Sequence, residues 1–102
     1  MTPPLPKGTT FQVPSTGNKK YTAIIPLDGK MRRVSFGHKE YQHYKDSVPA
    51  SLGGQKWKHK NHMDAARRKN YRARHGALVC SNGVLCINIK YSPAWFSYYF
   101  LW

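Results

Sequence analysis

The chain has 102 residues, of which 17 are Lys or Arg and only 4 are Asp or Glu, so its formal net charge is +13. A chain of this length has room for one small domain with a modest core, and such an excess of cations opposes compaction unless anionic partners lie nearby. Four acids leave little scope for paired-carboxylate catalysis. Nothing around Cys80 or Cys86 and His75 resembles an oxyanion loop, so no enzyme and no cofactor are expected.

The N-terminal residues 1 to 20 are rich in Pro, Thr, Gly and Ser, with Phe11 and Val13 as isolated apolar residues. This composition is typical of an extended arm rather than of a regular element. The stretch lacks the pattern of a signal peptide, and no apolar run in the chain is long enough to span a membrane. We therefore expect an arm over 1–20 and a single small domain over 21–102.

A β-hairpin is predicted where two β-type runs, residues 21 to 25 and 31 to 36, flank Asp28-Gly29. Both turn residues tolerate positive φ, which a tight hairpin turn requires. Pro26 has no backbone N–H for the ladder, so the first strand is expected to end there or to lie at an edge.

A helix is predicted over residues 62 to 75. Asn61 can cap it, with Asp64 three residues later as in a capping box, and Gly76 supplies a left-handed stop. Arginine surrounds most of this helix, so its own apolar face is too narrow to hold it in place. The stripe expected to be buried consists of small residues: Met63, Ala66, Asn70, Ala73 and Ala77.

A second hairpin is predicted over residues 77 to 89, around Asn82-Gly83. A two-residue turn would place Cys80 opposite Leu85 and leave Cys86 on the other face, so we expect two reduced, metal-free cysteines. A wider loop would bring the two cysteines together as a disulfide. A zinc site is a further alternative, but its candidate ligands contain no Cys-x-x-Cys: His59, His62, His75, Cys80 and Cys86.

Cations and aromatic residues alternate in residues 56 to 62 and 67 to 75. Such groups pair with phosphates and stack on bases, which indicates nucleic-acid contact. Equally, they fit a structural protein whose arginines pair with acidic protein surfaces and backbone carbonyls, and the excess of Arg over Lys on the helix favours fixed, bidentate partners. The expected anion- or partner-binding residues are Lys56, Lys58, Lys60, Arg67, Arg68, Lys69, Arg72 and Arg74.

Seven of the twelve residues from 91 to 102 are aromatic. Rings of this size carry large apolar areas and are not left together in water, so the tail folds back as core or docks into a neighbour. The residues expected to take part in aromatic docking are Trp57, Tyr71, Tyr91, Trp95, Phe96, Tyr98, Tyr99, Phe100 and Trp102. The elements together predict an α+β domain with two β-hairpins, one basic helix, an extended N-terminal arm and an aromatic C-terminal tail.

Three segments carry a resemblance to a known group of proteins. They are Val34-Ser35-Phe36-Gly37, Arg68-Lys69-Asn70-Tyr71-Arg72-Ala73-Arg74-His75-Gly76, and Tyr91-Ser92-Pro93-Ala94-Trp95-Phe96 with Leu101-Trp102 beyond it. In these segments the chain resembles small basic, largely uncharacterised structural proteins of large double-stranded DNA viruses of algae and protists. The similarity extends over about residues 20 to 102.

This resemblance implies a virion setting, with assembly in the host cytoplasm. The expected role is that of a minor capsid protein, on the inner side of an icosahedral shell or between capsomers, which cements major capsid units. Its partners would be capsid proteins of the same virion, with no small-molecule substrate. The alternative is a virion-internal protein that binds or condenses viral DNA without sequence specificity, through residues 56 to 74.

Overall fold

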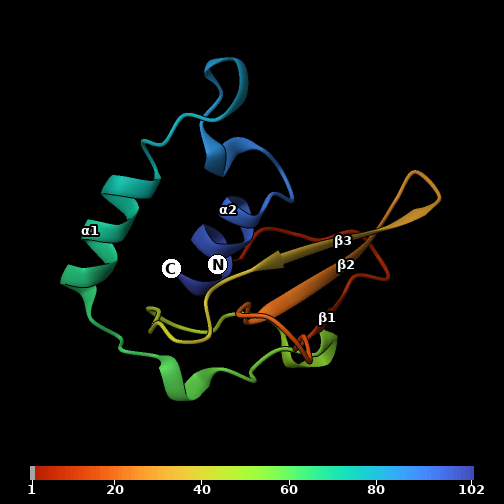
Figure 1. Ribbon diagram of the computed structural model, residues 1–102, viewed down its shortest axis with the longest axis horizontal. Helices are drawn as coiled ribbons and strands as arrows, with labels where there is room; N and C mark the ends of the chain where they lie inside the picture. Colours follow the sequence, from red (N-terminus) through yellow and green to blue (C-terminus); the bar gives the residue numbers. More distant parts are fainter. Residues whose placement is uncertain (1) are drawn as a thin grey trace.

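The computed structural model describes residues 2 to 102 (Figure 1). A three-stranded antiparallel sheet has the order β1-β2-β3, with β1 at Thr10–Gln12, β2 at Tyr21–Leu27 and β3 at Lys30–Phe36. The helices are α1 (Ala65–His75) and α2 (Pro93–Phe96), and α2 runs directly into a π-helical segment, η5 (Ser97–Leu101). Short 3-10 turns are η1 (Ala50–Leu52), η2 (Lys58–Lys60), η3 (Ser81–Gly83) and η4 (Cys86–Asn88). The predicted α+β class is therefore confirmed.

The first hairpin forms as predicted. Leu27 pairs with Lys30 across a two-residue turn in which Asp28 and Gly29 have φ values of 52° and 76°. Pro26 lies within β2, but β1 pairs with β2 only as far as Ile24. Beyond that point β2 is an edge on the β1 side, which is why a residue without an N–H is tolerated there.

Strand β1 is a correction to the extended arm expected over residues 1 to 20. Phe11 pairs with Ala23 in the sheet and is only 4% exposed. Its ring lies 6.1, 6.0 and 5.9 Å from the rings of Tyr21, Phe36 and Phe96. The boundary predicted at residue 20 thus falls between two strands of one sheet, because a single buried ring makes residues 10 to 12 part of the domain.

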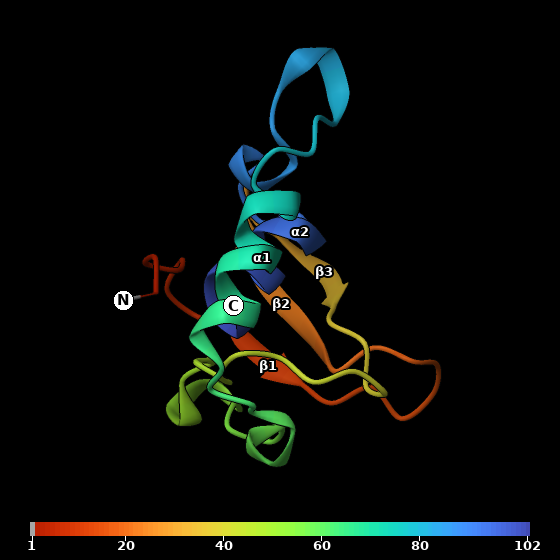
Figure 2. The same cartoon turned by 90° about the vertical axis from the view of Figure 1, so that its left-hand side faces the viewer.

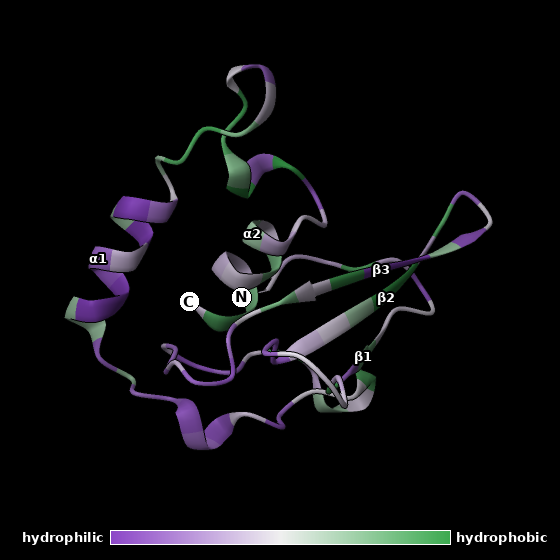
Figure 3. Ribbon diagram, viewed as in Figure 1, coloured by the Kyte–Doolittle hydropathy of each residue, from purple (hydrophilic) through white to green (hydrophobic). Residues whose placement is uncertain are grey.

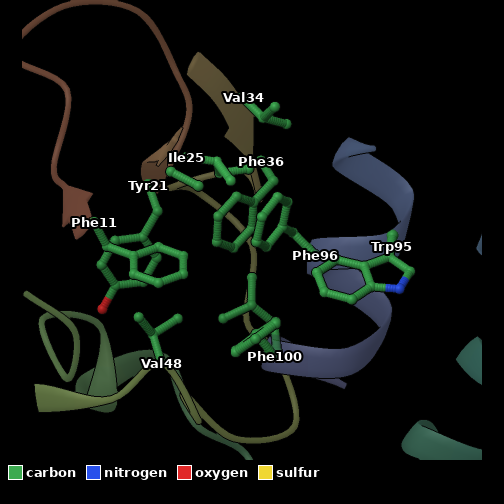
Figure 4. Packing of buried hydrophobic residues seen from close by; sticks show 11 residues of the cluster. Phe11, Tyr21, Ile25, Val34, Phe36, Val48, Trp95, Phe96 and Phe100 are labelled. Atoms are coloured by element: carbon green, nitrogen blue, oxygen red, sulfur yellow. The ribbon is translucent and has the colours of Figure 1, made fainter. Parts of the chain in front are cut away.

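The aromatic tail is the second layer of the core. Ser92 accepts a hydrogen bond from the Trp95 N–H and starts α2, with Pro93 at its first position. Phe96 has no exposed surface and stacks on Phe36 of the sheet at 5.0 Å, and Figure 4 shows Phe96 and Phe100 on the side of the sheet rings, with Trp95 beyond Phe96. Of the two expectations for the tail, folding back onto its own sheet is the one that the structure bears out.

Helix α1 begins later than predicted and is capped by a different residue. The Asp64 carboxylate accepts from the N–H groups of Ala66 and Arg67, whereas the Asn61 side chain is used elsewhere. Met63 has a φ of 55°, so the chain cannot be helical before Asp64. The expected left-handed stop at Gly76 is also wrong, since Gly76 is right-handed with a φ of −66°.

The face that α1 turns toward the body is the opposite of the expected one. Figure 2, seen from the α1 side, shows α1 lying over α2, away from the sheet. Its inner, half-buried residues are Arg68, Tyr71, Arg72 and His75. The stripe expected to be buried is exposed throughout: Met63, Ala66, Asn70, Ala73 and Ala77. No residue of α1 is fully buried.

The second hairpin is reduced to a short ladder, and its register explains a disulfide. Asn82 and Gly83 have positive φ values as the Asn-Gly turn predicts, but Val79 pairs with Leu85, one residue out of the expected register. This slip moves Cys86 to the same face as Cys80. The two cysteines form a disulfide with Cα atoms 5.0 Å apart, so the expectation of reduced thiols is wrong, and neither sulfur is a zinc-binding thiolate.

Candidate anion-binding surface

A buried polar network holds the long irregular connection between β3 and α1. The Lys20 ammonium donates to the Tyr41 carbonyl at 2.7 Å and to His43 Nδ1 at 2.8 Å. Because Nδ1 accepts, Nε2 carries the His43 proton and donates to Asn61 Oδ1 at 2.6 Å. Burial lowers the pKa of His43 to about 4, helped by the Lys20 charge, and burial lowers the pKa of Lys20 to about 8.

Asp46 is the carboxylate at the centre of the same connection. Its oxygens accept from the Tyr21 hydroxyl at 2.5 Å, the Trp57 N–H at 3.0 Å and the Val48 N–H at 3.0 Å. Burial, followed by the hydrogen bond to Asp46, raises the pKa of Tyr21. Asp46 is 1% exposed, so it serves internal donors and does not neutralise the basic surface.

Trp102 links α1 to the rest of the molecule. Its main-chain oxygen accepts from Arg68 Nε at 2.7 Å and from Arg72 Nε at 3.2 Å. Its ring is parallel to the Tyr71 ring at 4.1 Å, and Tyr71 stacks in turn on His75 at 3.9 Å. Burial raises the pKa of Tyr71 to about 12. The helix is therefore held by a stack of rings and by two arginines that donate to one main-chain oxygen.

Both of these guanidinium groups also lie on aromatic faces. Arg68 Cζ is 4.8 Å from the centroid of Tyr44, and Arg72 Cζ is 4.5 Å from the centroid of Tyr98. Ring faces are negative, so they partly neutralise a cation without a carboxylate. Beside them, His62 Nδ1 accepts from the Asp64 N–H, and burial lowers the pKa of His62.

A cavity of about 630 Å³ opens between the connection at residues 44 to 47, the inner face of α1 and the end of the tail. Lys45, Arg68 and Arg72 bring three cations to its wall, and Asp46 brings one carboxylate. The remaining lining residues are Thr2, Tyr44, Ser47, Gln55, Tyr99 and Trp102. The geometry can therefore accept an anion of moderate size.

The outer surface of α1 and of the preceding turn carries the other predicted cations. Lys56, Lys58, Arg67, Lys69 and Arg74 are exposed, and Lys60 is half-buried. Arg67 donates to the Gln42 side chain at 3.0 Å. Apolar side chains stand exposed at both ends of the helix, at Met63, Leu78, Val79 and Val84, and Figure 3 shows a hydrophobic segment leading from the hydrophilic helix into the disulfide-closed loop.

Of the predicted anion-binding residues, Arg68 and Arg72 thus share one cavity, while the other six lie outside it. The predicted docking residues Trp95, Phe96 and Phe100 are core residues of this chain, so docking to a partner is closed to them. Trp57, Tyr91, Tyr99 and Trp102 pack against the core, and Tyr71 and Tyr98 contact Trp102 and Arg72.

Lys45 and the buried network were not predicted as site residues. Lys20, His43, Asp46 and Asn61 lie in stretches without regular structure, and their hydrogen bonds span 15 to 23 residues where the network closes. The spacing of these residues follows no helical or strand period, so no local pattern marked them. The one signal available in the sequence was the scarcity of carboxylates, since each of the 4 acidic residues, Asp46 among them, is a candidate partner for many cations.

Comparison with protein-family models, with curated proteins and with solved structures finds no match to this chain in any of the three. Among residues 2 to 102 no helix is long and apolar enough to cross a bilayer. In the same part of the chain, no three His, Cys, Asp or Glu side chains are grouped as metal ligands.

Proposed function

We propose that this chain is a minor structural protein of a large icosahedral double-stranded DNA virus, which cements major capsid units by basic and aromatic contacts. The virion setting rests on the sequence resemblance, and the cementing role rests on the surface of the molecule. The contacting surface is the outer face of α1 with the apolar residues at its two ends.

The orientation of α1 carries this proposal. A helix normally turns its small and apolar residues inward, but here Ala66 and Ala73 face solvent while Arg68 and Arg72 face the body. An exposed alanine stripe permits close approach of another backbone, and flanking arginine and methionine side chains are enriched at protein interfaces. Such a mixed surface fits a protein partner better than it fits a nucleic acid, whose outer surface is uniformly phosphate.

The second candidate is a virion-internal protein that binds DNA without reading its sequence. It is favoured by the exposed cations Lys56, Lys58, Lys69 and Arg74, because the carboxylates of Asp46 and Asp64 are both occupied by internal donors. A protein of this kind binds phosphates by charge alone, with affinity that falls steeply as salt rises.

Localisation in the particle tests the proposal. Purified virions are opened so that the genome is released, and the protein is quantified in the shell and genome fractions at rising salt. We expect the protein to stay with the shell. If the protein instead leaves with the genome, and its share in the genome fraction falls as salt rises, the cementing role is refuted and the DNA-binding alternative is supported.

Two variants separate the roles at the level of residues. Ala73→Leu adds bulk to the exposed stripe without changing charge, so it should lower shell incorporation and leave the affinity for duplex DNA within about twofold. Arg74→Gln removes a neighbouring exposed cation and should weaken DNA binding. Ala50→Leu, at an exposed residue of η1 and outside α1, is the matched control for added bulk. Normal incorporation of Ala73→Leu would show that the stripe is not an interface.

A further inference from the structure

We propose that the cavity between residues 44 to 47, α1 and the end of the tail is a binding site for a phosphate dianion, as inorganic phosphate or as a terminal phosphate monoester. The inference does not depend on the cementing role, because it concerns the inner face of α1 rather than the outer one. Four observations carry it, namely the charge of the lining, its free donors, its preorganisation and its size.

The side chains of the lining carry more positive than negative charge. Lys45, Arg68 and Arg72 supply three positive charges, against the single negative charge of Asp46. Both Asp46 oxygens are already engaged by internal donors, which keeps this carboxylate from capturing the arginines. The side chains of the wall therefore leave an excess of positive charge, which favours a ligand with close to two negative charges, such as a phosphate monoester near neutral pH.

The two arginines keep most of their donors for a ligand. Among the described residues, each guanidinium makes its hydrogen bond through Nε, to the main-chain oxygen of Trp102, at 2.7 Å for Arg68 and 3.2 Å for Arg72. Their terminal N–H groups remain, and Ser47 lines the same wall. Two guanidinium forks that converge from adjacent turns of one helix suit an anion with several acceptor oxygens.

The site is held in place before any ligand arrives. Tyr44 and Tyr98 lie against the Arg68 and Arg72 guanidinium groups, and the main-chain oxygen of Trp102 fixes the direction of both side chains. Long cationic side chains usually lose much rotamer freedom on binding, so restraint in advance favours affinity. The exposed Lys69 and Arg74 on the outer face line no part of this cavity.

Phosphate is favoured over the other anions by number of acceptors and by size. A carboxylate offers two oxygens to at least three groups of donors, whereas a terminal phosphate offers three. A nucleic-acid backbone carries one negative charge per nucleotide along an extended chain. Such a chain would contact the exposed lysines of the outer surface before it reached this cavity. A volume of about 630 Å³ also leaves room for the group that bears the phosphate, beside Tyr44 and Tyr99.

Calorimetric titration of the full chain with inorganic phosphate, a nucleoside 5′-monophosphate and acetate tests the assignment. Phosphate should bind with a dissociation constant of about 1 mM or lower, and acetate at least about tenfold more weakly. Equal affinities for phosphate and the nucleotide would identify the phosphate alone as the ligand. Tighter nucleotide binding would assign the tyrosine wall to the rest of the ligand, and both of these outcomes support the site.

Lys45→Gln is the main variant, because this exposed side chain can be changed without touching the core. It should weaken phosphate binding by about tenfold, and Arg72→Gln should do the same. Arg74→Gln removes the same charge from the outer face of the same helix and should change the affinity by less than about twofold. Thermal melting checks that each variant is folded, and Lys45→Gln keeps the test valid if Arg72→Gln unfolds.

Three results would overturn the proposal. Phosphate that gives no binding heat up to about 20 mM would show that the cavity takes no such ligand. Equal losses in Lys45→Gln and Arg74→Gln would show that the protein attracts anions through its overall charge and not through this site. Acetate as strong as phosphate would assign the cavity to a carboxylate. Failure of the cementing role alone would change none of these measurements.

Discussion

Replacement of Phe96 by Ala should remove much of the stability of the domain. Phe96 has no exposed surface, stacks on Phe36 at 5.0 Å and meets Trp95 edge-on at 4.9 Å. Truncation of a buried Phe costs about 3 to 5 kcal/mol, against about 5 to 15 kcal/mol for the unfolding of a whole domain. At about 4 to 8 °C per kcal/mol for a domain of this size, the midpoint of thermal unfolding should fall by at least about 12 °C.

Urea denaturation followed by circular dichroism measures this loss, with thermal melting as a second readout. The midpoint should fall while the denaturant slope stays constant, because the same surface is exposed on unfolding. Met31→Ala, at a side chain that is 60% exposed on β3, is the control and should stay within about 0.5 kcal/mol of the parent. A loss below about 1 kcal/mol for Phe96→Ala, with an unchanged slope, would refute the view that the tail is core.

Three further predictions concern the disulfide, the helix cap and pH. The intact protein should be lighter than its reduced form by two hydrogen atoms, and reduction of Cys80–Cys86 should cost about 2 kcal/mol of stability for so short a loop; an unchanged mass would contradict the disulfide. Asp64→Ala should lower the free energy of unfolding by about 1 kcal/mol and speed amide exchange in the first turn of α1. Asp64→Asn, which keeps an acceptor oxygen, should have a smaller effect, and equal exchange rates in the two variants would reject the cap. Because the folded pKa of His43, about 4, lies below the unfolded value, the unfolded state binds more protons between pH 6.5 and 4, so stability should fall as pH falls through that window. His43→Gln should flatten this dependence, and a parent-like slope in that variant would assign it to other groups.

The parts of the fold that follow from local chemistry were predictable. Asp28-Gly29 gives a two-residue turn because both residues tolerate positive φ, and the pairing of Leu27 with Lys30 follows from it. The tail was predictable as core or docking segment because its ring area is large for a short stretch. Local propensity could not decide between these two, since the choice depends on whether the sheet offers a matching face. Phe11 and Phe36 supply that face.

The parts that failed depend on contacts between distant segments. Strand β1 has only three residues, too few for an alternating pattern, and it is recognisable only from the place of Phe11 among rings of β2, β3 and the tail. The disulfide depends on a one-residue slip at Asn82-Gly83, which no rule of turn composition specifies. The phosphate cavity combines Lys45 with two arginines that are more than 20 residues further along the chain.

The inverted orientation of α1 follows from the scarcity of acids in this chain. With 4 carboxylates against 17 lysine and arginine side chains, the fold has few anions for buried cations. Arg68 and Arg72 instead use the faces of Tyr44 and Tyr98 and the main-chain oxygen of Trp102, of which the aromatic tail provides the last two. These acceptors orient both guanidinium groups, and the tyrosine faces neutralise their charge only in part. The helix is thus fixed by its arginines while its alanines and Arg67, Lys69 and Arg74 remain exposed, so the proposed anion site lies on its inner face and the proposed protein contact on its outer face.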